Sequence, residues 1–412
     1  MSPPSRRAVA GPVLLAVGAA ELGVRLLAPR ERLPPPAAVR LLDYFSEAEI
    51  ERGRRFARPQ RALALSRAGV QLAGLVGVVA GLRRRRPAGG GAAAGAATGA
   101  GLALASTLAA LPLSALSRRR AVAVGLVTQS WRGWAADVAK ATAIEAGLAA
   151  GAGAVVVVLT ERYPRRWWAP AAAGSVLFSA GLGALAPVLL DPIFNDFTPL
   201  PEGSLRADVL SLAGAAGVRI GEVYAIDASR RTTAANAYVT GLGPTKRVVL
   251  FDTLIDRYSR EEIRTVVAHE LAHVRHRDVA RAVAYAAIVA GPLARAVQRV
   301  AAALAPEARG AAALPALALA GAAVGVPAGL LGNRLSRAVE RRADADALAL
   351  SGAPEAFVSF ERAIALQNVA DLDPPRWVTA LVATHPSTAE RIGAAVAAGE
   401  RTPRESRAAA SS

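Results

Sequence analysis

Seven long apolar stretches divide this chain of 412 residues and restrict what it can fold into. They lie at roughly 8–28, 62–82, 92–116, 141–160, 167–190, 279–305 and 311–331. Each approaches the roughly 20 apolar residues that an α-helix needs to cross the hydrocarbon core of a bilayer. Because 53% of all residues are hydrophobic and only 20% are charged, an ordinary soluble enzyme is a poor description of the chain. The sequence predicts a mainly α, polytopic membrane protein with about seven transmembrane helices.

The first and sixth stretches are less clear than the other five. The first follows a basic N-terminus, as in a signal peptide, but more spans come after it and no small-residue cleavage site stands out, so an uncleaved span is expected. The sixth is interrupted by Arg281, Arg295 and Arg299. Charged side chains inside a span usually face a bundle interior or a cavity, or reach for the interface.

The formal net charge of +17 does not indicate a nucleic-acid-binding protein. A nucleic-acid surface needs its basic residues gathered on a soluble domain. Here they form short clusters between apolar stretches, such as Arg118–Arg120, as expected of loops beside membrane spans. The chain has no cysteine, so disulfides, thiol chemistry and Cys-ligated metals are excluded.

Four polar segments remain outside the predicted spans, at 29–61, 117–140, 191–278 and 332–412. With seven crossings they all lie on one side, opposite the N-terminus, although arginines on both sides leave the orientation undecided by charge. We divide the chain into 1–190, with spans one to five and the soluble loops 29–61 and 117–140; 191–278, a catalytic region; 279–331, with spans six and seven; and a C-terminal region, 332–412.

The segment 191–278 is predicted to be α+β. Three short strand-like runs, at 222–226, 237–240 and 247–251, suggest a small antiparallel sheet. Ser259 and Glu262 have the spacing of a capping box just before an apolar run. A helix is therefore expected from about Ser259 through His276.

Three of the four histidines of the chain fall on that helix. His269 and His273 are four residues apart and share one face, so both imidazoles can reach one ion, with Glu270 beside it. In the His-Glu-x-x-His motif neutral imidazoles bind one Zn²⁺, and the glutamate takes a proton from the water that attacks a carbonyl. The alternative is an incidental cluster at a helix end. The scarcity of histidine elsewhere favours the zinc site.

A catalytic zinc site needs a third protein ligand. His276 is too far, because seven residues separate it from His269, roughly 10.5 Å along a helix. The helical stretch 336–350 contains Glu340 and, one turn later, Asp344. One carboxylate could bind the ion while the other orients a ligand histidine through its second nitrogen. A solvated helix face rich in Arg and Asp is the alternative reading of this stretch.

The remaining histidine, His385, stands in the loop-like run Thr384–Ser387. It could donate a hydrogen bond to the oxyanion of a tetrahedral intermediate. It could equally be a histidine of a surface loop.

Several longer segments, together with these motifs, carry a family resemblance. They are YFSEAEIERGRRFARPQ (44–60), GLVTQSWRGWAAD (125–137), DPIFNDFTPLPEG (191–203), NAYVTGLGPTKRVVLFDTL (236–254), HELAH (269–273), ERRAD (340–344) and HPSTAER (385–391). In these the chain resembles the type I CAAX prenyl endopeptidases, which are integral-membrane zinc metallopeptidases. The resemblance implies seven spans enclosing a chamber, closed on the cytoplasmic side of the cell membrane by a small zincin-like catalytic region.

Carried over residue by residue, the resemblance assigns roles to the candidates. It implies that His269, His273 and Glu340 are the zinc ligands and Glu270 the general base. It further implies that Asp344 supports a ligand from behind and that His385 is the oxyanion donor. The run Asn236, Ala237 and Tyr238 is similar to the edge strand that pairs with an extended peptide.

The expected partners are therefore a peptide or protein substrate, lipid-modified or membrane-associated, and membrane lipid. The Ala-rich composition suggests a bacterial source, where prenylated CAAX proteins are not expected, so the chemistry transfers better than the substrate does. Two alternatives are a heat-shock-type membrane quality-control metalloprotease, from a family of shorter chains with fewer spans, and a non-enzymatic metal-binding sensor or transporter. An intact Glu270 argues against the latter, because binding alone needs no base.

Overall fold

The computed structural model describes residues 6–84, 90–241 and 246–409, and helices dominate it. Seven of the described helices are long and apolar enough to cross a membrane, which agrees with the sequence prediction. They are α1 (Arg6–Leu27), α2 (Glu47–Arg84), α3 (Ala92–Ala123), α4 (Trp131–Arg162), α5 (Trp168–Leu189), α10 (Asp278–Leu304) and α11 (Leu314–Ser351). The Arg-interrupted sixth stretch is thus one continuous helix, α10.

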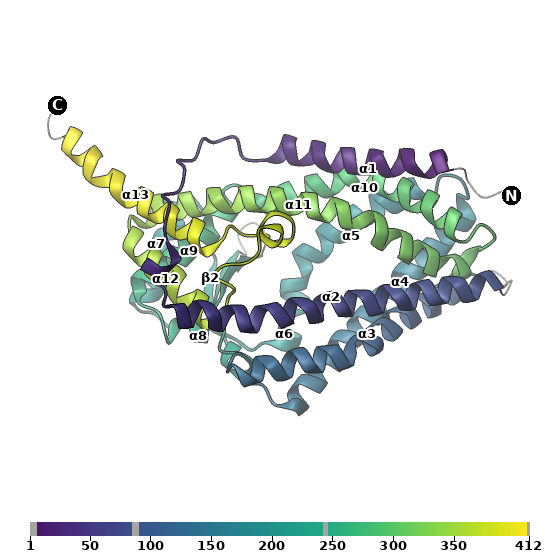
Figure 1. Ribbon diagram of the computed structural model, residues 1–412, viewed down its shortest axis with the longest axis horizontal. Coiled ribbons are helices and arrows are strands. Elements are labelled where there is room, and N and C mark those ends of the chain that lie inside the picture. Colours follow the sequence, from purple (N-terminus) through teal and green to yellow (C-terminus); the bar gives the residue numbers. More distant parts are fainter. Residues whose placement is uncertain (1–5, 85–89, 242–245, 410–412) are drawn as a thin grey trace.

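The long helices follow the long axis of the molecule, and a small α+β region caps one end (Figure 1). Small residues bring the helices close. Val289 and Ala296 of α10 pack against α1 at Ala20 and Ala16. A Cβ placed on Gly95 of α3 would lie 2.7 Å from the Gly153 oxygen of α4, so this crossing requires glycine. Such close backbone approach is typical of helices packed in a membrane.

Several of these helices are longer than a bilayer is thick. Helices α2 and α11 have 38 residues each, about 57 Å, against a hydrocarbon core of about 30 Å. The polar segments predicted as loops at 29–61 and 117–140 are therefore partly helical, since α2, α3 and α4 continue into them. Helix α11 likewise extends from its apolar half into the α+β region, where it carries Glu340 and Asp344.

The α+β region is built around a sheet with strand order β1-β2-β4-β3. Its elements are α6 (Asp191–Phe194), β1 (Phe197–Pro199), α7 (Ser204–Ala215), β2 (Glu222–Ile226), β3 (Ala237–Thr240), β4 (Arg247–Phe251), α8 (Asp252–Ile255), α9 (Arg260–Arg275), α12 (Pro354–Gln367) and α13 (Thr388–Ala409), with short turns of helix at Leu41–Asp43, Ala228–Arg230, Gly310–Ala313 and Val378–Val382.

The expectation of a purely antiparallel sheet is wrong. Strands β2 and β4 pair in parallel, whereas β1 with β2 and β3 with β4 are antiparallel. Strand β4 lies between β2 and β3 because Val248, Val249 and Leu250 are all fully buried, so the strand needs neighbours on both edges and cover on both faces. Its continuous apolar run was the signal of a central strand.

Helix α9 begins and ends as the sequence predicts. Ser259 accepts a hydrogen bond from the Glu262 amide, and the Glu262 carboxylate accepts one from the Ser259 amide, so the capping box is complete. Ile263, Val267 and Leu271 form one apolar face that packs into the core with Leu250 and Leu254. This packing leaves the His269 and His273 side of α9 facing α11.

Candidate metal centre and active site

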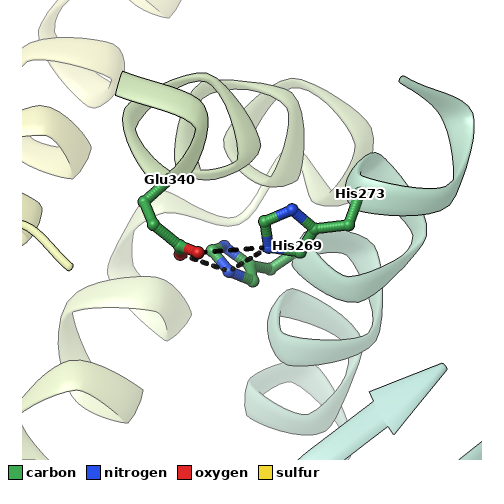
Figure 2. A group of neighbouring side chains, drawn as sticks. All are labelled: His269, His273 and Glu340. Atoms are coloured by element: carbon green, nitrogen blue, oxygen red, sulfur yellow. Dashed lines mark hydrogen bonds and ion pairs between the residues drawn. The ribbon is translucent and has the colours of Figure 1, made fainter. Parts of the chain in front are cut away.

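His269, His273 and Glu340 converge between α9 and α11, as Figure 2 shows. The Nε2 atoms of the two histidines are 3.2 Å apart. Glu340 Oε2 is 3.2 Å from His269 Nε2, and Glu340 Oε1 is 3.6 Å from His273 Nε2. Three potential ligand atoms from two helices thus face one another across a single small space.

These separations fit a tetrahedral zinc site. With Zn–N bonds of about 2.0–2.1 Å, two ligand atoms of a tetrahedron are about 3.3–3.4 Å apart. Glu340 Oε2 is also buried without any hydrogen-bond donor, which is costly unless a cation faces it. The residues therefore fit one zinc ion, bound through two imidazole Nε2 atoms and a carboxylate.

Each of the two imidazoles has an acidic partner at its other nitrogen. His269 Nδ1 is 2.9 Å from Asp344 Oδ1, and His273 Nδ1 is 3.0 Å from Asp278 Oδ2. A carboxylate at Nδ1 favours the tautomer whose Nε2 lone pair is free for a metal. The structure thus brings Glu340 to the ligand group and Asp344 behind it, the division that the family resemblance implies.

Asp278 is a site residue that the sequence reasoning missed. It begins α10, and Arg277 before it adopts a left-handed backbone conformation, with φ of 55°, which turns the chain back toward α9. Arg342 and Arg281 both donate hydrogen bonds to Asp278 and hold its carboxylate. Asp278 is only five residues after His273, which could have indicated that the two side chains lie close together. The sequence does not predict the turn at Arg277 that brings Asp278 to His273.

His276 lies outside the ligand group. Its Nε2 is 2.5 Å from Asp346 Oδ2, and this pair stands apart from the three converging side chains. Helix geometry already argued that His276 and His269 cannot reach the same ion.

A buried ion network lies behind the candidate metal centre. Arg391 of α13 donates to both Asp344 oxygens, at 2.6 and 3.0 Å, and is 2.6 Å from Glu361 of α12. Burial raises the pKa of the Glu361 carboxyl to about 7, because the charge of Arg391 offsets only part of the desolvation and Asp344 adds repulsion. Burial acts to lower the pKa of the Arg391 guanidinium, but the same two carboxylates outweigh it and raise the pKa above the ordinary value. Neither Glu361 nor Arg391 was a sequence candidate, although Arg391 ends the HPSTAER segment.

Glu270 lines a cavity of about 460 Å³ beside the ligand group. Burial raises the pKa of its carboxyl above the ordinary value. A carboxylate made more basic in this way is better suited to accept a proton from water. The remaining wall is partly apolar, with Val266, Phe360 and Ile364.

His385 borders the same cavity from the loop before α13. Its Nε2 is 3.5 Å from Glu340 Oε2, and its Nδ1 contacts the Thr384 hydroxyl at 2.9 Å. The side chain is 59% exposed, so it can meet a ligand entering the cavity.

Strand β3 forms one edge of the sheet and leads into the cavity. Asn236 and Ala237 line the cavity, whereas the Tyr238 hydroxyl contacts Asp191 at 3.2 Å on the other side. The Asn236 carbonyl accepts from the Phe251 amide, so the backbone groups of Asn236 and Tyr238 face β4. Those of Ala237 and Val239 point to the free edge.

Comparison with known proteins places this chain among metalloproteases. The family model “Peptidase family M48” matches residues 199–398. “Uncharacterized metalloprotease YhfN” of Bacillus subtilis is 32% identical over 300 residues, which cover 71% of this chain and 70% of that protein. “CAAX prenyl protease 1” of Saccharomyces cerevisiae is 42% identical over 102 residues, only 24% of this chain and 22% of the yeast protein.

The fold has a counterpart among solved structures. The crystal structure of S. mikatae Ste24p matches with a TM-score of 0.73 and 20% sequence identity, covering 96% of this chain and 100% of the other. The likeness therefore extends over the long helices as well as the α+β region.

Proposed function

The chain belongs to peptidase family M48, and from this premise we propose that it is a zinc-dependent endopeptidase of the cell membrane, with Glu270 as the general base. The observation that carries the proposal is the convergence of His269, His273 and Glu340 beside a cavity that Glu270 lines. The proposed organisation is a catalytic region at 191–278, completed by 332–412 and held by the membrane helices of 1–190 and 279–331.

The two imidazoles and Glu340 would hold one Zn²⁺. When bound there, zinc polarises a peptide carbonyl and makes water more acidic. Asp344 and Asp278 fix the ring orientation of His269 and His273, and Arg391 fixes Asp344.

Glu270 moves the proton. Its carboxylate takes a proton from the attacking water and passes it to the amine that leaves, so that one bond to carbon forms and the C–N bond breaks. His385 donates a hydrogen bond to the oxygen on which negative charge develops. Its exposed side chain, at the mouth of the same cavity, leaves it free to do so.

The substrate backbone would add as a strand to β3. The outward amides and carbonyls of Ala237 and Val239 are suited to an extended peptide, because strand addition uses the unpaired edge of a sheet. The substrate we propose is a peptide or protein at the membrane that carries a lipid group, cleaved on the cytoplasmic side. Two supports for this are the CAAX prenyl proteases among the relatives and the seven helices beside the site.

The test is cleavage by detergent-purified protein of two CAAX peptides that differ only in a farnesyl group. A chelator should abolish cleavage, and added zinc should restore it. Glu270→Gln should lower kcat by about 10²- to 10⁴-fold while zinc content stays at one ion per chain. Unchanged turnover by this variant would refute the role of Glu270.

The peptide pair tests the substrate separately. Preferential cleavage of the farnesylated peptide is expected if a lipid tail is recognised. Equal cleavage of both peptides would leave the endopeptidase in place but refute lipid recognition, and would favour a general membrane quality-control protease. Absence of zinc-dependent cleavage of either peptide and of unfolded membrane proteins would refute the enzymatic proposal.

A further inference from the structure

A second cavity, of about 870 Å³, lies at the end of the long helices opposite the candidate metal centre. It is lined by the end of α4, the connection from α4 to α5, the end of α10 and the start of α11. The end of α10 lies at the right of Figure 1. Helix α10 connects the two sites. It begins at Asp278 beside His273 and, with 27 residues, is about 40 Å long.

The lining of this cavity is strongly basic. Arg165, Arg295, Arg299 and Arg309 contribute four positive charges, and Glu161 contributes one negative charge. The sum is a net charge of +3 around one cavity. Arg295 and Arg299 are one helical turn apart, where like charges repel.

Two of these guanidinium groups donate hydrogen bonds to neutral acceptors and not to carboxylates. Arg295 donates to the Gln298 side chain at 2.5 Å, and Arg309 donates to the carbonyls of Pro306 and Ala308. Within 6–84, 90–241 and 246–409, no carboxylate forms an ion pair with any of the four arginines. Glu161 is therefore the acidic side chain of the lining, and the net charge of +3 stays unbalanced there.

The position of the cavity makes that charge costly. Arg295 lies about two and a half turns inside the end of an apolar helix, where an uncompensated cation is expensive. Placing an anion against the arginines would remove the repulsion and satisfy their free donors. A guanidinium suits a phosphate especially, because its planar donors match two phosphate oxygens.

We propose that this cavity binds the phosphate headgroup of an anionic phospholipid. The arginines of the lining would bind the phosphate. The apolar part of the lining, with Ala301, Ala316 and Leu317, would contact the first carbons of the acyl chains. Trp167 also lines the cavity, and Trp168 stacks near Arg295 at 5.8 Å, which is typical of the membrane interface.

A soluble phosphate would match the arginines equally well, but it would leave the apolar wall unused. The proposal concerns a lipid site whose arginines, Arg295 and Arg299, lie about 26–32 Å along α10 from Asp278, and it is independent of the proposed enzymatic activity.

The experiment measures thermal unfolding of the full chain, purified in a neutral detergent. The additives are dihexanoyl phosphatidylglycerol, dihexanoyl phosphatidylcholine or inorganic phosphate, each titrated at constant ionic strength. We expect phosphatidylglycerol alone to raise the Tm in a saturable manner. Arg295→Gln combined with Arg299→Gln should weaken the apparent Kd at least tenfold.

The matched control is the double variant Arg162→Gln and Arg166→Gln. Both arginines are exposed and lie outside the cavity lining, Arg162 at the end of α4 and Arg166 in the connection to α5, and the loss of charge is the same. This variant should respond to phosphatidylglycerol as the parent protein does. An equal loss in the control would show a diffuse surface effect and overturn the proposal.

The responses of the parent protein test the proposal even if the variant with both Arg295→Gln and Arg299→Gln fails to fold. An equal response to phosphatidylcholine, or no response to phosphatidylglycerol, would overturn the assignment of an anionic headgroup. An equal response to inorganic phosphate would overturn the assignment of a lipid and leave an anion site.

Discussion

Arg391 contacts both carboxylate oxygens of Asp344, and Asp344 in turn contacts the ring nitrogen of His269 that faces away from the candidate metal centre. A largely buried cation thus lies directly behind a candidate metal ligand. The arrangement ties α13, at the C-terminal end of the chain, to α9 and α11. It also implies that the geometry of the centre depends on residues that never touch the metal.

Loss of Glu340 should remove the metal. Glu340→Ala deletes one of three ligand atoms, so purified protein should contain far less than one zinc per chain. Asp344→Asn should weaken zinc affinity by about 10- to 100-fold, because it disturbs the orientation of His269 without removing a ligand. Metal analysis and competition with a chelator measure both effects.

Asp346→Asn is the matched control for these two variants. Asp346 lies on the same helix but contacts His276, outside the ligand group, so zinc content should not change. Full zinc occupancy in Glu340→Ala would show that the third ligand lies elsewhere.

Removal of Arg391 should destabilise the protein strongly. Arg391→Gln leaves Asp344 and Glu361 buried without their shared cation, a change that typically costs about 3–5 kcal/mol. Arg341→Gln breaks a more exposed ion pair with Glu390 and should cost at most about 1 kcal/mol. Thermal unfolding in detergent compares the two variants, and similar losses would contradict the role of Arg391.

Glu361 should make stability depend on pH. Its pKa is raised to about 7 in the folded protein, above the ordinary value of 4.5, so the unfolded chain releases this proton first as the pH rises. The contribution of Glu361 to the free energy of unfolding is therefore fully present below pH 4.5 and is lost as the pH rises to about 7.

Glu361→Gln isolates this effect, because glutamine stays neutral at every pH. The Tm of the parent protein minus the Tm of Glu361→Gln should decrease as the pH is raised from 5 to 8 at constant zinc concentration. A difference that is constant or rises with pH would contradict the assigned shift.

Proline at Val239 should impair peptide binding without unfolding the sheet. The Val239 amide points away from β4, so proline removes a donor only from the free edge, where proline is tolerated. If substrate adds to β3, kcat/KM should fall roughly tenfold, the worth of about one lost hydrogen bond. Val239→Thr keeps the amide and should cleave normally. Equal kcat/KM for both variants, with an unchanged Tm, would argue against strand addition.

The features that the sequence by itself determined are local in the chain. The spans follow from runs of apolar residues, α9 from its capping box, and the pairing of His269 with His273 from helical spacing. Each depends on neighbours within a few residues, whose geometry a helix imposes. For the same reason the sequence excluded His276 from the ligand group.

The tertiary structure decided what depends on distant parts of the chain. Spacing on α11 left Glu340 and Asp344 equivalent, and only the packing of α11 against α9 brings one to the ligand group and the other behind it. Likewise the central place of β4, the ion network of Arg391, and the Arg-lined cavity arise where separate elements meet. Burial and charge at these contacts depend on the whole fold. They could not be predicted, because contacts between distant segments leave no periodicity or spacing in the sequence.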